Sequence, residues 1–277
     1  MPRIDAHQHF WKFDPLRDSW ITDDMAVIQK DFMPADLQPL LAANGLDGSV
    51  IVQSAQSDEE NDFQLANAAE NDFIKGVVGW IDLQSHHVES RLMYYKQFKK
   101  MKGFRHVLQG ETDRALMLKP AFKRGVGILE KFGFTYDILI FPDQLQYIPA
   151  FVAAFPNQPF IIDHIAKPLI KHREMEDWKK DMQAVAGFEN VYCKISGMVT
   201  EADWKKWKPV DFKPYLDVIV EAFGIKRIMF GSDWPVCLVA ASYSEMMNIV
   251  NDYFSSFSQN EQDLFFGNNA TSFYKLV

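Results

Sequence analysis

The chain has 277 residues, 48% of them apolar and 24% charged, which is enough to bury a sizeable core and typical of a globular protein. Its 29 basic and 37 acidic side chains give a formal net charge of -8 at pH 7, which argues against a nucleic-acid partner. The two cysteines, Cys193 and Cys237, are too few for a disulfide framework, and neither a membrane span nor an export signal is visible, so we expect a cytoplasmic protein without membrane contact.

Eight short apolar runs recur along the chain and predict its strands. Several are nearly continuous in valine, isoleucine and phenylalanine, a pattern typical of strands that are covered on both faces in a parallel sheet. In chain order the runs span residues 4–10, 48–53, 74–82, 101–107, 134–140, 159–165, 191–197 and 227–234.

Helix signals fill most of the gaps between these runs. Residues 36–44 end at Gly45, and Ser57 has capping-box spacing to Glu60. Apolar stripes at helical spacing cover residues 63–69, 145–155, 175–185 and 212–223. The glycines of the fourth unit interrupt its pattern and leave the start of its helix unplaced. Eight alternating units predict an α/β fold, a single (β/α)8 barrel domain over residues 1–277.

The first run carries two histidines at alternate positions, His7 and His9. On a strand both imidazoles face the same side, while Ala6 and Gln8 point the other way. In a (β/α)8 barrel the reacting groups stand at the carboxyl ends of the strands, where the sixth run contributes His164 and the eighth Asp233. Only a closed barrel brings these four side chains together.

Three histidines and one aspartate permit two kinds of carbonyl hydrolysis. His7, His9, His164 and Asp233 can hold one divalent ion such as zinc, with space for water. Without metal, the histidines would donate to a carbonyl oxygen while Asp233 takes a proton from the attacking water. The structural alternatives are a buried His164 satisfied by Asp163 or the main chain, and an Asp233 that caps a helix.

Five further polar or aromatic residues fall at strand ends and are expected to contact substrate. They are Gln53, Trp80, Arg105, His106 and Lys194. The alternative for Lys194 is a structural ion pair. The aromatic-bearing loops 11–34 and 198–210 are candidates for a lid, although their tryptophans can equally pack the rim of the barrel.

These motifs together resemble the amidohydrolase superfamily, and most closely its sugar-lactonase branch, the L-rhamnonolactonase- and L-fuconolactonase-like proteins. The resemblance covers nearly the whole chain and implies a distorted (β/α)8 barrel that opens an aldonolactone to its acid. It makes Asp233 similar to the family's general base, and His7, His9 and His164 similar to its carbonyl-polarising or metal-binding histidines. The matching segments are IDAHQHFW at 4–11, GFRH at 103–106, DHIAKP at 163–168, KISG at 194–197, FGSDWP at 230–235 and GNNA at 267–270.

The chain also departs from the family pattern. Many metal-dependent members carry a bridging lysine or glutamate on the fourth strand and a further histidine on a middle strand, where this chain has Arg105, His106 and Asp137. A two-metal site is therefore not expected, which leaves one zinc-like ion or a metal-independent site.

The resulting prediction is a hydrolase that acts on a small-molecule sugar lactone, as a monomer or homodimer, with Asp233 as general base. Two alternatives stay open. One is a zinc-dependent decarboxylase of the same superfamily, and the other is a catalytically inactive sugar-binding barrel.

Overall fold

The computed structural model describes residues 2–276 and contains one sheet of eight parallel strands in sequential order. The strands are β1 (Ile4–Gln8), β2 (Gly48–Val52), β3 (Ile74–Gly79), β4 (Met101–His106), β5 (Thr135–Ile138), β6 (Phe160–Ile162), β7 (Val191–Ile195) and β8 (Ile228–Phe230). The last strand returns to the first through a bridge between Gln8 and Trp234, and the Asp233 N–H donates to the His7 carbonyl at 2.8 Å. The predicted (β/α)8 barrel is confirmed.

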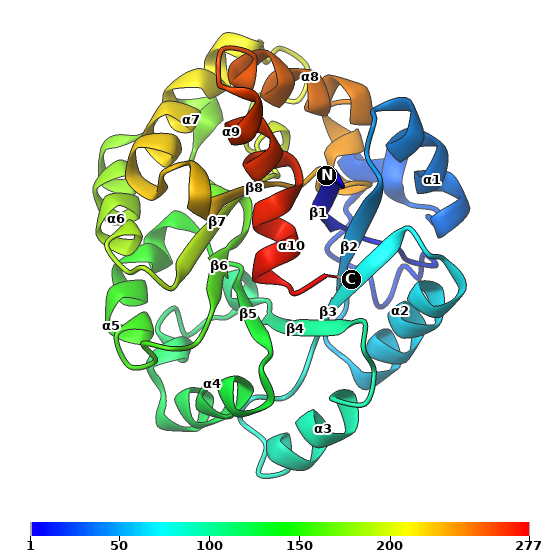
Figure 1. The fold of residues 1–277 in the computed structure, drawn as a ribbon, viewed down its shortest axis with the longest axis vertical. Helices are drawn as coiled ribbons and strands as arrows, with labels where there is room; N and C mark the ends of the chain where they lie inside the picture. The colour runs from blue at the N-terminus through cyan, green and yellow to red at the C-terminus, as the bar shows by residue number, and fades with distance from the viewer. Residues whose placement is uncertain (1, 277) are drawn as a thin grey trace.

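Helices surround the barrel, and α10 crosses the end at which the strands begin (Figure 1). The helices are α1 (Pro34–Ala43), α2 (Asp58–Glu70), α3 (Val88–Tyr95), α4 (Pro120–Phe132), α5 (Ile148–Val152), α6 (Glu176–Ala186), α7 (Pro209–Phe223), α8 (Tyr243–Phe254), α9 (Gln259–Asp263) and α10 (Asn269–Phe273). The Ser57 side chain accepts from the Glu60 N–H, as its spacing predicts. Within residues 2–276, no helix has the length and apolar character to cross a bilayer.

Helix α4 is the one that the sequence pattern concealed. It begins at Pro120, whose missing N–H costs nothing in the first turn, and it ends at Gly133 in the left-handed conformation. Gly125 lies inside the helix because a Cβ there would come within 2.0 Å of the Leu83 carbonyl oxygen. This glycine weakens the helical pattern in the sequence but permits the helix to approach the chain that follows β3.

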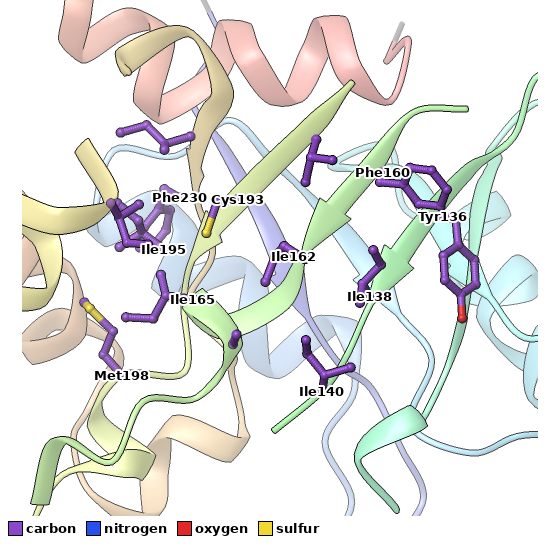
Figure 2. Close-up of a cluster of buried hydrophobic side chains, with 14 of the residues drawn as sticks. Tyr136, Ile138, Ile140, Phe160, Ile162, Ile165, Cys193, Ile195, Met198 and Phe230 are labelled. Atoms are coloured by element: carbon purple, nitrogen blue, oxygen red, sulfur yellow. The ribbon is translucent and has the colours of Figure 1, made fainter. Parts of the chain in front are cut away.

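The strands separate two apolar layers. Figure 2 shows outward side chains of β5 to β7, among them Tyr136, Ile138, Phe160, Ile162 and Cys193, in the layer between sheet and helices. A smaller inner cluster fills the barrel near the start of the strands and is closed by α10. Its members are Ile4, Ala6, Val50, Val52, Val78, Ile161, Met229, Ala270, Phe273 and Tyr274. The carboxyl half of the barrel interior is thus left for polar side chains.

A β-bulge in β1 changes the predicted alternation around the two histidines. The pairing of β1 with β2 slips by one residue between Asp5 and Gln8. Ala6 therefore packs in the inner cluster, although His7 also turns toward the barrel axis. The prediction that Ala6 points away from the histidine side was wrong, because the extra residue of a bulge redirects the side chains that follow it.

Candidate functional site

Side chains from the first, sixth and eighth strands meet at the mouth of the barrel. His7 lies in β1, His164 follows β6 and Asp233 follows β8, and one ligand atom of each lies within 4.8 Å of the others. Asp233 Oδ1 is 3.9 Å from His7 Nε2 and 3.8 Å from His164 Nε2. All three side chains are buried, so the charge of Asp233 is little screened by water.

His9 joins this trio from the other side of His7. Its Nε2 lies 3.2 Å from His7 Nε2 and 3.3 Å from Asp233 Oδ1. Its Nδ1 lies 2.7 Å from the carbonyl oxygen of Val52, which only accepts hydrogen bonds. A neutral His9 therefore carries its proton on Nδ1 and turns the lone pair of Nε2 toward the site.

The neighbours of His7 favour the same tautomer. Arg105 Nη1, which can only donate, lies 3.3 Å from His7 Nε2, and Asp163 Oδ1 lies 3.3 Å from His7 Nδ1. The proton therefore belongs on Nδ1, facing Asp163, although Lys194 Nζ also lies 3.2 Å from that nitrogen. His7 Nε2, like His9 Nε2, presents a lone pair to the space beside Asp233.

This arrangement suits one cation. Two imidazole lone pairs and a carboxylate oxygen converge with no donor among them, and a divalent ion of the zinc type accepts this set of nitrogen and oxygen ligands. His164 supplies a further nitrogen. The Arg105 guanidinium beside His7 opposes such an ion by placing a positive charge 3.3 Å from one ligand nitrogen. The residues therefore fit a single ion whose affinity is reduced by the neighbouring arginine.

Protonation states at the site follow from burial and from neighbouring charges. Burial raises the pKa of Asp233, but His164, His9 and Lys167 outweigh burial, and the net shift is downward. Burial lowers the pKa of His7 and of His164 well below the usual range. At neutral pH the ionised carboxylate of Asp233 consequently lies beside the neutral imidazoles of His7 and His164, which suits a proton acceptor beside polarising groups.

The side-chain partner of His164 is Ser196, and not Asp163 or the main chain as the structural alternative predicted. Asp163 contacts His7, Lys194 and Arg105, whereas His164 Nδ1 lies 2.9 Å from Ser196 Oγ. The His164 ring fits because residue 197 is a glycine, at which a Cβ would lie 2.6 Å from Nδ1.

Gly197→Ala should therefore displace the His164 ring and lower kcat/KM by about 100-fold, since misplacing a reacting group by about 1 Å has effects of that size. Steady-state kinetics would measure the loss. Gly224→Ala is the matched control, because Gly224 has a similar φ of +66° but no atom within 4 Å of the added Cβ. Equal activity in the two variants would show that His164 tolerates the displacement.

Four of the five predicted substrate-contacting residues lie around the mouth but are bonded to one another. Arg105 Nη2 donates to the Gln53 carbonyl at 2.5 Å, and the Gln53 amide donates to the Arg105 carbonyl at 3.2 Å. The Trp80 indole N–H faces His106 Nδ1 at 3.4 Å, and His106 Nε2 donates to Glu111 at 2.7 Å. These contacts fix the strand ends and leave few free donors for a ligand.

Lys194 lies beneath the histidines and is completely buried. Its Nζ lies 2.5 Å from Asp137 Oδ2 and 3.0 Å from Asp163 Oδ1. The Tyr274 hydroxyl donates to Asp137 at 2.7 Å, which links α10 at the far end of the barrel to the site. These contacts match the structural ion pair weighed as the alternative for Lys194.

Asp5 supports the site, a role that was not predicted from the sequence. Its carboxylate accepts from the Ser232 N–H at 2.9 Å, the Ser232 hydroxyl at 2.6 Å and the Tyr243 hydroxyl at 2.9 Å, and also from the His7 N–H at 3.1 Å. One buried side chain thus joins the strand that carries His7 to the turn that carries Asp233. An acidic residue two positions before a His-x-His pair was the available signal.

Three of the four tryptophans in the two lid candidates are anchored by their indole N–H groups, whereas Trp20 is 42% exposed and packs edge-on against Trp11. Trp11 is buried and donates to the Lys30 carbonyl at 2.9 Å, Trp204 donates to that of Thr200 at 2.8 Å, and Trp207 to that of Ala240 at 2.8 Å. These contacts favour packing of the rim over closure on a ligand.

Comparison with known proteins places the geometry in context. The amidohydrolase family model matches residues 4–276. The L-fucono-1,5-lactonases of Burkholderia multivorans and Burkholderia ambifaria are 37% and 33% identical to this chain over 285 residues, with coverage of 99% of this chain and 96% of each relative. A crystal structure of an amidohydrolase from Burkholderia multivorans with bound zinc has a TM-score of 0.96, 37% identity and 100% coverage of both chains.

Proposed function

The chain belongs to the amidohydrolase family of hydrolases, and from that premise we propose that it opens a sugar lactone by adding water to the lactone carbonyl. The observation that carries this proposal is the convergence of the ionised Asp233 with His7, His9 and His164 at the barrel mouth. The similarity to two L-fucono-1,5-lactonases supports the substrate class. It gives the decarboxylase alternative no comparable support.

In this proposal Asp233 is the general base. Its carboxylate accepts a proton from water as the water oxygen bonds to the carbonyl carbon, and the same proton then passes to the ring oxygen, which leaves as a hydroxyl group. His164 faces the developing oxyanion with its Nε2, which carries a proton when Ser196 donates to Nδ1. The single product is an open-chain hydroxy acid, which contains all the atoms of the lactone and of the water molecule.

His7, His164 and Asp233, with His9 beside them, are the residues that would hold a divalent ion. Such an ion, when bound, supplies Lewis-acid polarisation of the carbonyl oxygen. Arg105, whose guanidinium lies 3.3 Å from His7 Nε2, would weaken the binding of such an ion.

A proton-release assay over a panel of aldonolactones, including L-fucono-1,5-lactone, tests the proposal. Each lactone is supplied to the protein treated with chelator and to the protein supplemented with zinc. We expect turnover of at least one six-carbon lactone well above spontaneous hydrolysis. Sugar binding without turnover in both preparations would instead support an inactive binding barrel, and release of carbon dioxide from an aromatic acid would support a decarboxylase.

The pH dependence of kcat/KM should reflect the lowered pKa values at the site. Because the pKa of Asp233 lies below its usual value, the base stays ionised as pH falls, and its protonation lowers activity only below the ordinary range for aspartate. His7 and His164 stay neutral over the same interval. We expect kcat/KM to stay constant between about pH 7 and about pH 5. A loss centred near pH 6.5 would show that a histidine of ordinary pKa controls the reaction.

A further inference from the structure

The residues that follow β6 form a left-handed turn. His164, Ile165, Ala166 and Lys167 have φ values of 55°, 47°, 58° and 51°, a conformation that costs roughly 1–2 kcal/mol per residue for non-glycine side chains. The turn is closed by a hydrogen bond from the Lys167 N–H to the His164 carbonyl at 2.8 Å. Four consecutive residues in this region are unusual, and such strain is concentrated at functional sites.

The geometry of this turn sets the direction of the Lys167 side chain relative to that of His164. In a turn closed by bonds between residues three apart, the side chains of the first and fourth residues project from the same side. Ile165 and Ala166 are fully buried, whereas Lys167 keeps 17% of its side chain exposed. The turn therefore directs Lys167 toward the same side as His164, at the mouth of the barrel.

Lys167 meets a second partly buried charge there. Its Nζ lies 3.7 Å from Oε1 of Glu201, which follows β7 and keeps 18% of its side chain exposed. That separation exceeds a hydrogen bond, so the pair is close but not joined by one. An oxygen about 2.8 Å from both atoms would complete a triangle, accepting from the ammonium and donating to the carboxylate.

The surroundings of the pair suit a sugar ring. Lys167 Nζ lies 5.5 Å from the centre of the Phe141 ring, whose side chain is partly exposed and offers an apolar face for C–H groups. Burial raises the pKa of Glu201, Lys167 lowers it, and the charge of Asp233 raises it again. Lys167 likewise influences both Asp233 and His164. The pair is therefore within electrostatic range of the reacting carboxylate.

We propose that Lys167 and Glu201 form the specificity-determining subsite of the lactonase, in which one ring hydroxyl of the substrate bridges the ammonium and the carboxylate. A hydroxyl group satisfies both partners because it has one proton to donate and lone pairs to accept with. The subsite selects polyhydroxylated lactones over lactones that lack this hydroxyl. This inference rests on the proposed lactonase function and deepens it.

The test compares wild type, Lys167→Met and Glu201→Gln on L-fucono-1,5-lactone, or on whichever aldonolactone wild type hydrolyses fastest, and on the monodeoxy analogues of that lactone. Each variant should lose about 10- to 100-fold in kcat/KM on the parent lactone, the effect of one hydrogen bond to a charged group. On the analogue without the bridging hydroxyl, wild type should be equally impaired and the variants should lose little more.

Lys171→Met, at an exposed lysine just beyond the turn, is the control and should match wild type. Thermal unfolding of each variant separates misfolding from loss of contact. The inference is overturned if both variants keep wild-type activity on the parent lactone, or if they are impaired to the same extent on every analogue. Absence of lactone turnover by wild type would instead overturn the proposed function itself.

Discussion

Replacing Asp233 by asparagine should lower kcat on a sugar lactone by about 10²- to 10⁴-fold, the range measured for loss of a general base. The amide cannot take a proton from water, yet it has nearly the same shape as the carboxylate. The substitution also suits the backbone, because Asp233 has a φ of 58° and asparagine tolerates that left-handed conformation better than most residues. The effect should therefore be chemical and not structural.

The matched control for Asp233→Asn is Asp62→Asn, the same chemical change at an exposed carboxylate of α2. Steady-state kinetics and thermal unfolding would be measured for both variants. We expect the control to keep wild-type turnover, and Asp233→Asn to unfold near the wild-type temperature. Turnover within tenfold of wild type in Asp233→Asn would defeat the general-base assignment.

Lys194→Met should lower the free energy of unfolding by about 3–5 kcal/mol, as removal of one partner of a buried ion pair does. The substitution keeps the length of the side chain but removes the charge that faces Asp137 and Asp163, both of which are fully buried. Asp137 then loses the cation that faces it, and the Tyr274 hydroxyl cannot replace that charge, whereas Asp163 keeps the Arg105 guanidinium at 3.1 Å.

The pH dependence of that loss distinguishes an electrostatic effect from a packing effect. In wild type, burial already raises the pKa of Asp137 to about 6, and Lys194 limits the rise. Without Lys194 the folded-state pKa rises further above the unfolded value, so stability falls as pH rises through that interval. The deficit should be larger near pH 8 than near pH 5. Chemical denaturation at both pH values, with exposed Lys99→Met as control, measures it, and a deficit below about 1 kcal/mol would refute the ion-pair role.

The barrel was predictable because its strands are buried on both faces and separated by amphipathic helices, and this pattern depends on local sequence. The start of α4 was not predictable, because Gly125 interrupts the helical pattern. This glycine is required by the close approach of the Leu83 carbonyl, which lies on a distant segment. The bulge in β1 escaped prediction for the same reason, since the pairing with β2 sets it. Local patterns report which faces are covered but not which distant groups approach one another.

The same division applies to the site. His7, His9, His164 and Asp233 could be selected because the barrel rule brings the carboxyl ends of strands together. The supporting role of Asp5 could not be predicted, because its hydrogen bonds to Ser232 and Tyr243 join segments more than 200 residues apart. Lys194 could be selected as a strand-end residue. Its contact with His7 could not be predicted, because it depends on how the long lysine side chain extends inside the barrel.

Hydrolysis in water enriched in ¹⁸O tests water attack on the carbonyl most directly. The protein is incubated with its best aldonolactone, and the product acid is analysed by mass spectrometry, with the spontaneous reaction subtracted. Attack at the carbonyl predicts one ¹⁸O atom in the carboxylate and none in the hydroxyl released from the ring. Label in that hydroxyl, or an unlabelled product, would contradict activation of water by Asp233 for attack on the lactone carbonyl.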